Sequence, residues 1–234
     1  MKEIDVSGIA GMQPVRGGTD SWYYVLDGTY GDLYEAQEIY GYRGEIGGSR
    51  FFLIRHPDGA VFRPLPAVPD TVAGEPVYHE NRISFPAVDF ARKEIRIHTF
   101  DCGSGETEET AVMPLDAVKD CYNLRLFGSP LTLTRQGNDG TLEMIWPQRK
   151  TFRIGTRESF YHRDGNELYL SDWFEDPEYR EETVVRDAET GAVLRRMPGD
   201  VLVMPNGELW HLQGKAVRLS RAGTAGDRAQ EEKQ

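Results

Sequence analysis

Short runs that alternate between hydrophobic and polar residues recur along the chain and are separated by glycine-containing turns. In SRFFLIRHPDGAVFRPLP, residues 49–66, an apolar run leads through a Pro-Asp-Gly turn into a second apolar run. The same plan returns in residues 93–115, around a Gly-Ser-Gly loop, and in residues 129–147, around an Asn-Asp-Gly turn. Alternation with a period of two, interrupted by such turns, is typical of antiparallel hairpins. The pattern therefore predicts a chain rich in β-strands.

The C-terminal half contains two more copies of this plan. The fourth copy has a strand in residues 166–174, an acidic insertion, EDPEYREE, and a hairpin in residues 183–198. The fifth copy, residues 207–221, turns at a Gly-Lys pair. A proline closes each of the first four copies: Pro66, Pro114, Pro147 and Pro198. These prolines lie 48, 33 and 51 residues apart, near the roughly 40–50 residues of a propeller blade.

These repeats predict an all-β fold, a propeller-like array of about five antiparallel blades or hairpin repeats. We expect one domain over residues 1–221 and a disordered C-terminal tail, residues 222–234, which has no hydrophobic residue larger than alanine. A strand in residues 20–28 precedes the first copy and would close the ring by pairing with the last hairpin, which would protect an exposed sheet edge. The same turns also fit the alternative, a sandwich or barrel formed by an antiparallel meander.

Helical periodicity is limited to two short segments. In residues 31–42, the side chains of Leu33, Ala36 and Tyr40 recur at three- and four-residue steps. Residues 114–124 show the same spacing. Because such steps place side chains on one face of a helix, each segment predicts one short helix.

One hairpin resembles a known repeat. In VVRDAETGAVLRRMP, residues 184–198, an apolar strand ends in Asp187, a Thr-Gly turn follows, and a second strand leads to a proline. This stretch is similar to the outer hairpin of blades in quinoprotein-like and YVTN lactonase-type β-propellers. Asp187 would accept hydrogen bonds from turn amides, and Gly191 would take the positive φ of the turn. The resemblance implies the fold alone, because the functional residues of those families and the tryptophan-docking signature of quinoproteins have no counterpart here.

Composition and charge narrow the choice of partners. The chain has 234 residues, of which 39% are hydrophobic and 11% aromatic, enough for a large core and unlike a disordered chain. Lys and Arg number 27 against 38 Asp and Glu, which gives a net charge of -11. Because such a chain repels a polyanion, we expect no nucleic acid partner, whereas a basic protein partner is compatible with the charge.

Cysteine content and hydropathy bear on the compartment. The two cysteines, Cys102 and Cys121, are too few for a disulfide scaffold. The N-terminal residues lack a continuous apolar leader, and no segment reaches the length of a membrane span. We therefore expect a cytoplasmic protein with free thiols and no membrane contact. The sequence leaves the oligomeric state open.

The densest polar cluster is the acidic and aromatic segment SDWFEDPEYREE, residues 171–182. Carboxylates at this spacing serve as hard oxygen ligands for Ca²⁺ or as the acid and base that flank a sugar, and aromatic rings give a sugar an apolar face. The alternative is a solvated acidic loop held by one buried aromatic ring. The candidate binding residues of this segment are Asp172, Trp173, Glu175, Asp176, Glu178 and Tyr179.

A second set of candidate binding residues lies on predicted strands. His98 and His211 each fall in the first strand of a copy, and first strands line the central axis of a propeller. Trp210 precedes His211 and offers an aromatic surface for binding. No phosphate loop, zinc-ligand spacing or hydrolase motif accompanies them, so we expect neither a metal site nor a cofactor, and no catalytic residue is assigned.

Three functions are compatible with these observations. The favoured interpretation is a non-enzymatic binding or interaction scaffold for a protein or a glycan. The second is a hydrolase of glycans or lactones that uses carboxylates between Asp172 and Glu178. The third is an acidic inhibitor or immunity-type partner of a basic protein.

Overall fold

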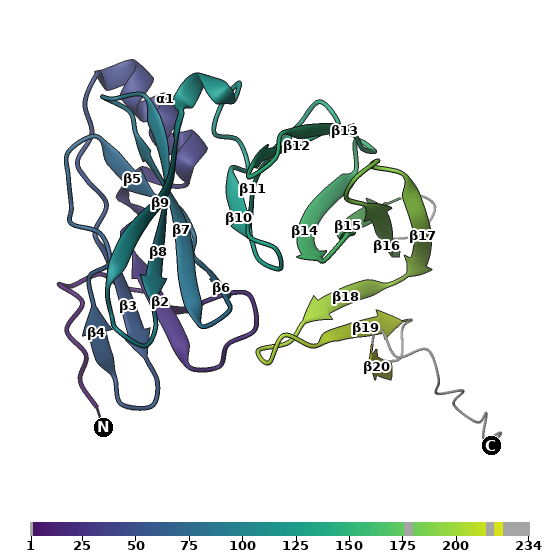
Figure 1. The fold of residues 1–234 in the computed structure, drawn as a ribbon, viewed down its shortest axis with the longest axis horizontal. Coiled ribbons are helices and arrows are strands. Elements are labelled where there is room, and N and C mark those ends of the chain that lie inside the picture. Colours follow the sequence, from purple (N-terminus) through teal and green to yellow (C-terminus); the bar gives the residue numbers. More distant parts are fainter. Residues whose placement is uncertain (1, 176–179, 214–217, 222–234) are drawn as a thin grey trace.

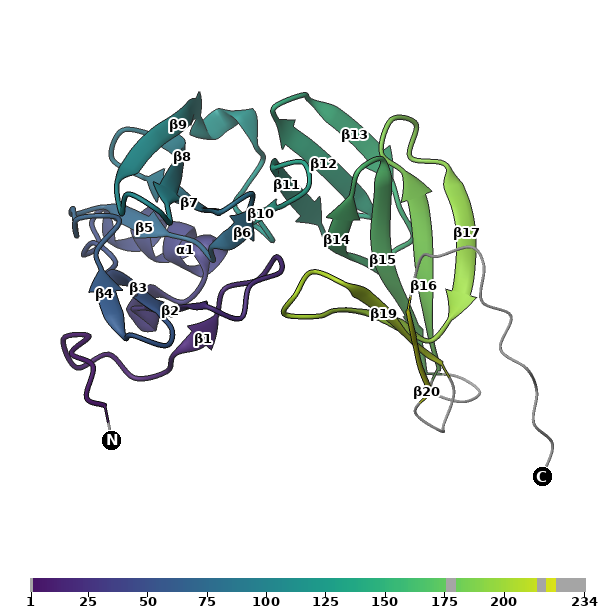
Figure 2. The ribbon, with the colours of Figure 1, turned by 60° about the horizontal axis from the view of Figure 1, so that its bottom comes forward.

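The computed structural model describes residues 2–175, 180–213 and 218–221. Within them, twenty β-strands dominate over one α-helix and two short 3-10 helices. The strands form five sheets, which follow one another in chain order around a common centre (Figures 1 and 2). The predicted all-β, propeller-like fold with about five antiparallel repeats is therefore confirmed. The predicted tail, residues 222–234, lies outside the described residues.

Each sheet is an antiparallel meander of strands that are consecutive in sequence. The first sheet contains β1 (Gln13–Pro14), β2 (Trp22–Leu26), β3 (Phe51–Arg55) and β4 (Ala60–Phe62). The second contains β5 (Thr71–Ala73), β7 (Arg82–Asp89), β8 (Glu94–Asp101) and β9 (Thr107–Pro114), with β6 (Val77–His79) also paired to β7. The third contains β10 (Arg125–Phe127), β11 (Thr132–Gly137), β12 (Thr141–Trp146) and β13 (Lys150–Arg153).

The fourth and fifth sheets complete the array. The fourth contains β14 (Glu158–Asp164), β15 (Glu167–Phe174), β16 (Arg180–Asp187) and β17 (Val193–Pro198). The fifth contains β18 (Asp200–Val203), β19 (Leu209–Gln213) and β20 (Arg218–Arg221). Four sheets are thus complete blades, and the described part of the fifth has three strands.

In four sheets the first strand lies nearest the centre, and in the second sheet β6, which pairs with the same strand as β5, takes this place. Residues from β1, β6, β10, β14 and β18, or from the loops beside them, line one cavity of about 340 Å³. The last strands of the complete sheets, β4, β9, β13 and β17, contribute nothing to its lining. The chain therefore runs outward through each blade and returns to the centre to begin the next.

Outer hairpins of the second and fourth sheets share the turn that the sequence resemblance implied. Asp187 Oδ1 accepts the backbone N–H groups of the second and third residues after it, at 3.0 and 2.7 Å. Asp101 Oδ1 does the same at 2.9 and 2.7 Å. A glycine with positive φ completes each turn, Gly191 at 72° and Gly105 at 77°. Because the amides stabilise the charged carboxylate, the pKa of both aspartates is lowered.

Hydrophobic residues fill the spaces between neighbouring sheets. Phe51 of the first sheet meets Phe85 of the second, with ring centroids 4.7 Å apart. The next three interfaces have equivalent clusters, represented by Ile97 with Leu133, Met144 with Leu170, and Tyr169 with Val201. Since alternate residues of a strand project to opposite faces, each complete inner sheet can pack against both of its neighbours.

The first and last sheets meet through loops rather than through paired strands. The strand predicted in residues 20–28 is β2, which pairs with β1 and β3, so its expected pairing with the last hairpin is wrong. Instead Gly18 lies against Gly207, and a Cβ added to Gly18 would be 2.9 Å from the Gly207 Cα. The two glycines have φ values of 95° and 81°. Both the close approach and the positive φ require glycine at this junction.

The helix predicted in residues 31–42 is present as α1 (Leu33–Arg43), after a single 3-10 turn, η1 (Gly28–Tyr30). Asp32 and Glu35 form a capping box at its N-terminus. Buried residues of the helix join the hydrophobic cluster between the second and third sheets. The helix thus covers one end of that interface.

The helix predicted in residues 114–124 is wrong except for a 3-10 turn, η2 (Leu115–Ala117). Beyond that turn the backbone N–H groups have short local partners or a distant one: the Leu124 N–H donates to the Cys121 carbonyl oxygen, and the Cys121 N–H donates to Gln37 Oε1 at 2.8 Å. Both cysteines are free, as predicted, and both are buried. Burial raises the pKa of the Cys102 and Cys121 thiols to about 12.

Candidate functional site: the centre of the ring

The structure divides the acidic and aromatic segment that the sequence singled out. Asp172 and Trp173 lie in β15 and project to opposite faces, because neighbours along a strand alternate. Asp172 is 5% exposed, whereas Trp173 is 41% exposed. Glu175 follows the strand and is exposed. Asp176, Glu178 and Tyr179 lie outside the described residues.

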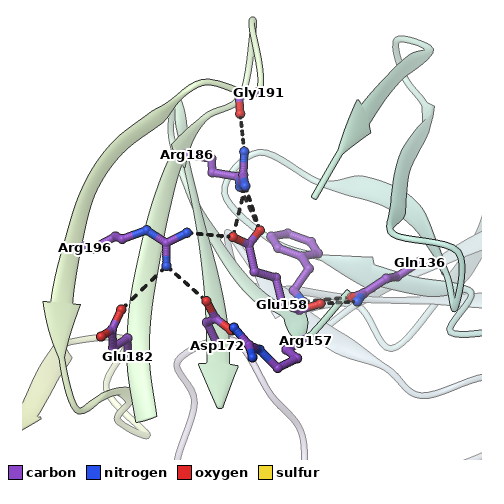
Figure 3. Close-up of polar contacts among 9 residues, drawn as sticks. Gln136, Arg157, Glu158, Asp172, Glu182, Arg186, Gly191 and Arg196 are labelled. Carbon is purple, nitrogen blue, oxygen red and sulfur yellow. Dashed lines mark hydrogen bonds and ion pairs between the residues drawn. The ribbon is translucent and has the colours of Figure 1, made fainter. Parts of the chain in front are cut away.

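Asp172 belongs to a set of ion pairs that crosses the fourth sheet (Figure 3). Arg196 of β17 places Nη1 3.0 Å from Asp172 Oδ2 and 3.6 Å from Glu182 Oε2. Its Nη2 is 3.3 Å from Glu158 Oε1. Arg186 of β16 donates to both oxygens of Glu158, at 2.9 and 3.0 Å. Side chains from all four strands of this sheet are thereby connected.

This network is balanced in charge. Arg157 Nε lies 3.5 Å from Asp172 Oδ1, so three arginines face three carboxylates. The side chains of Glu158 and Asp172 are only 1% and 7% exposed. Because guanidinium groups hold these buried carboxylates, binding of a metal ion by them would require breaking an ion pair. We refer to Arg157, Glu158, Asp172, Glu182, Arg186 and Arg196 as the fourth-sheet network.

The histidines lie on strands other than the ones predicted. His98 is in β8, the third strand from the centre, where its ring stacks on Phe85 at 5.4 Å. Burial lowers the pKa of His98. His211 is in β19, the second strand, with Nε2 2.7 Å from the Pro198 carbonyl oxygen. The prediction that both line the axis is wrong, because the copies recognised in the sequence begin in the middle of a blade.

Trp210 also lies in β19, and it is partly buried. Its Nε1 donates to Glu208 Oε2 at 3.1 Å. Neither it nor the adjacent histidine lines the cavity at the centre of the ring. The histidine that does line that cavity is His162, in the innermost strand β14. Burial lowers its pKa also, against the opposing effect of Asp164.

The central cavity is the space of about 340 Å³ lined by residues of all five sheets, from β1, β6, β10, β14, β18 and the loops beside them and from the start of β19. Val15, Phe127 and Leu209 are among its apolar walls, and Gly18 and Gly207 close it at the junction of the first and last sheets. Its charged and titratable lining consists of Arg16, His162, Asp164 and two tyrosines, Tyr78 and Tyr161. The cavity is therefore apolar over most of its wall, with a few polar groups at defined points.

A second space, the N-terminal hollow, lies beside it and measures about 250 Å³. Gln13, Tyr24, Glu75 and Arg125 contribute polar groups to its lining. Tyr24 donates its hydroxyl hydrogen to Gln13 Oε1 at 3.0 Å. The ion pair between Arg16 Nη2 and Glu75 Oε2, 2.8 Å long, joins one residue of the central cavity to one of this hollow.

Two arginines lie together where these spaces meet. The Arg16 guanidinium lies over the ring of Phe127, 5.9 Å from its centroid. Arg125 is two residues before Phe127 in β10 and shares its face of the strand. Burial lowers the pKa of Arg16, Glu75 opposes this effect, and the charge of Arg125 adds to it. Among the described residues, none forms an ion pair or a hydrogen bond with the Arg125 guanidinium.

Arg125 also borders a third space, the interblade hollow of about 200 Å³ between the third and fourth sheets. Asn123, Thr134 and Ser159 supply its other small polar side chains. Arg125 is its sole charged lining residue in the described part of the chain. The centre of the ring thus contains a guanidinium group that faces two hollows and has no protein partner among the described residues.

Sequence reasoning missed these central residues. Arg16 and Glu75 are 59 positions apart and belong to no motif. Arg125 stands in the short strand RLF, which has no alternation long enough to recognise. The one available signal was a cationic residue in an apolar run of an acidic chain, which is too common to indicate a site.

The described residues include no group of three or more His, Cys, Asp or Glu side chains that could hold a metal ion. They also include no helix that is both long and apolar enough to cross a bilayer.

Fold and centre together define a β-propeller-like protein with a central cavity. Among protein-family models none matches the chain, and no curated protein matches it. A solved structure that is similar to it is the "putative 6-phosphogluconolactonase from Bacteroides uniformis ATCC 8492", at 10% identity and a TM-score of 0.40, covering 91% of this chain and 70% of that one. A similarity of this size says nothing about activity.

Proposed function

We propose that the protein is a non-enzymatic binding protein that holds a small ligand, of about the size of a sugar, in its central cavity. The observation that carries this proposal is the cavity of about 340 Å³ that is lined by residues of all five sheets. Its volume lies within the range of small-molecule sites, which begins at about 300 Å³. Apolar walls with a few fixed polar groups are also typical of such sites.

The state of the carboxylates supports binding over hydrolysis. A glycosidase needs one carboxyl group that gives up its proton and a second that acts as base or nucleophile. In the fourth-sheet network, Arg186 and Arg196 occupy the oxygens of Glu158, and Asp172 is buried against Arg157 and Arg196. The carboxylate that the sequence offered as a catalyst therefore serves to hold the strands together.

A ligand screen on paired variants tests this proposal. We would measure the melting temperature with a library of monosaccharides, sugar acids and other small metabolites. Met204 lines the cavity, so Met204→Trp should fill part of it. Leu202, two residues earlier on the same chain segment, is exposed and outside the lining, so Leu202→Trp is the matched control.

A ligand present at one hundred times its Kd stabilises the folded state by about 2.7 kcal/mol, which for a chain of this length raises the melting temperature by roughly 5–10 °C. We expect this increase in the unmodified protein and in Leu202→Trp, and its loss in Met204→Trp. A compound that stabilises all three proteins equally would lie elsewhere and would contradict the proposed site. Chemical conversion of a bound compound would contradict the non-enzymatic assignment.

A further inference from the structure

We propose that Arg125 binds an oxyanion group of the ligand, a carboxylate or a phosphate, in the interblade hollow. This inference rests on the proposed function and names the class of ligand that the centre of the ring accepts. The shared chemistry is a small organic molecule with one negatively charged oxygen group and hydrogen-bonding substituents.

The first argument is the state of the Arg125 guanidinium. It is half-buried and borders both the N-terminal hollow and the interblade hollow. It makes no ion pair or hydrogen bond with a residue that the structure describes. A guanidinium presents five N–H donors in a planar fork, and carboxylates and phosphates are the partners that match this geometry. The group is partly withdrawn from water, and a bound anion would replace the hydration that it has lost.

The second argument is the arrangement of donors around Arg125. Arg125 and Thr134 are direct partners in the β10–β11 ladder, which places both side chains on one face. Ser159 lies at the start of β14, on the opposite wall of the hollow. Together with Asn123, these hydroxyl and amide groups have no hydrogen-bond partner among the described residues. They are available to the oxygens of a ligand.

The third argument is the rigidity of the walls. Gln136 Nε2 donates to the Glu158 carbonyl oxygen at 2.7 Å, and its Oε1 accepts from the Phe160 N–H at 2.8 Å (Figure 3). This amide therefore joins the third sheet to the backbone on both sides of Ser159. Phe127 meets Phe160 with ring centroids 4.3 Å apart and forms an apolar floor. Donors held on a fixed frame lose little entropy when they bind a ligand.

The neighbouring charges direct the anion to the interblade hollow. The N-terminal hollow also contains the carboxylates of Glu75 and Asp32. Glu75 is engaged by Arg16, and Asp32 caps α1, and these two carboxylates disfavour an anion on that side. In the interblade hollow, Arg125 has no acidic neighbour among the lining residues. Arg16, above Phe127, adds a second positive charge nearby.

Titration calorimetry with three related sugars tests the inference. D-Glucuronate carries a carboxylate, glucose 1-phosphate carries a phosphate, and glucose is neutral. We expect at least one charged sugar to bind, and glucose to bind at least about tenfold more weakly, since a charge-assisted hydrogen bond contributes about a factor of ten or more. Comparison of the two charged sugars identifies whether the carboxylate or the phosphate is preferred.

Variants then locate the binding. Arg125→Met should weaken binding of the charged sugar at least about tenfold and leave binding of glucose unchanged. Arg92→Met is the matched control, because Arg92 is an exposed arginine whose side chain is 65% accessible, and it should bind as the unmodified protein does. Ser159→Phe, at an exposed position, should block the hollow by its size and provides a second test that leaves the guanidinium in place.

Equal binding of the charged sugar to the unmodified protein and to Arg125→Met would overturn the inference, as would no binding of either charged sugar. The proposed function has a separate outcome. If Met204→Trp abolishes binding of a neutral library compound while Arg125→Met does not affect any ligand, the central cavity is a binding site and the oxyanion assignment is wrong. If no compound binds at all, both are wrong.

Discussion

Arginines of the fourth-sheet network and arginines at the centre of the ring have opposite surroundings. In the network, Arg186 and Arg196 meet the buried carboxylates of Glu158 and Asp172 at 2.9 to 3.3 Å, and each positive charge has a negative counterpart. At the centre, Arg16 has one carboxylate partner, Glu75, and Arg125 has none among the described residues. The network is therefore complete without a ligand, whereas the centre has unused hydrogen-bonding capacity.

This difference distinguishes charged side chains that hold the strands together from charged side chains that are available to a ligand. A buried ion pair with all its partners present fixes the geometry of the strands that carry it. A guanidinium that faces a hollow without a counter-ion gains a partner only when something binds. Asp172, the described buried carboxylate of the acidic segment, belongs to the balanced network, whereas the binding role predicted for the rest of that segment stays a prediction.

The largest expected effect is on the network. Glu158→Ala leaves Arg186 and Arg196 without their shared carboxylate, and loss of one partner of a buried pair costs about 3–5 kcal/mol of unfolding free energy. Urea denaturation followed by circular dichroism would measure it. Glu182→Ala removes a more exposed carboxylate, 30% accessible, and should cost less than about 1 kcal/mol. Similar losses of unfolding free energy in Glu158→Ala and Glu182→Ala would show that burial does not strengthen the ion pairs of Glu158.

A matched pair of arginine variants sharpens the comparison. Arg186→Met breaks two hydrogen bonds to Glu158 and one to the Gly191 carbonyl oxygen. Because Arg196 still pairs with Glu158, we expect a loss of about 1.5–3 kcal/mol of unfolding free energy, the contribution of hydrogen bonds to a charged group. Arg125→Met breaks no contact with the described residues and should change stability by no more than about 0.5 kcal/mol. The same denaturation experiment measures both. A large loss of stability in Arg125→Met would show that Arg125 stabilises the fold, as the arginines of the fourth-sheet network do.

Acid should lower the stability of the folded protein through its buried histidines. Burial lowers the pKa of His79, His98 and His162 in the folded protein. The unfolded chain then binds more protons just below the ordinary histidine pKa of about 6.5, so stability is complete above that pH and decreases as the pH falls through and below it. We expect a lower urea midpoint at pH 5.5 than at pH 7.5. His162→Phe should reduce this decrease, and a stability that rises on acidification would contradict the assignment.

The smallest expected effect concerns a residue that the sequence placed at the axis. His211 lies outside the lining of the central cavity. His211→Gln should therefore leave the affinity for any cavity ligand within about twofold, because a substitution without contact to the ligand rarely changes binding free energy by more than about 0.5 kcal/mol. Calorimetry with the same ligand would measure this. A strong loss of affinity would show that His211 contributes to ligand binding.

The local pattern of the sequence was sufficient to predict the hairpin strands and their turns. The hairpins around residues 49–66, 93–115 and 129–147 are present as predicted, and so is the Asp187 turn with its glycine. Turn residues and alternation act over a few positions, so they can be read directly. The helix predicted in residues 114–124 is absent beyond η2, where the Cys121 N–H donates to the side chain of Gln37, 84 positions away, instead of to a helical carbonyl group.

By itself the sequence determined that this protein is all-β, how its strands alternate and where most of them turn. Only the tertiary structure decided which strand of each blade is innermost, and with it that His162, rather than His98 or His211, lines the central cavity, while Arg125 borders the two hollows beside it. It also decided which charges pair, since Arg16 and Glu75 meet across 59 residues of chain. The physical reason is that alternation is a short-range property, whereas the partner of a charge depends on how separate sheets pack around the common cavity.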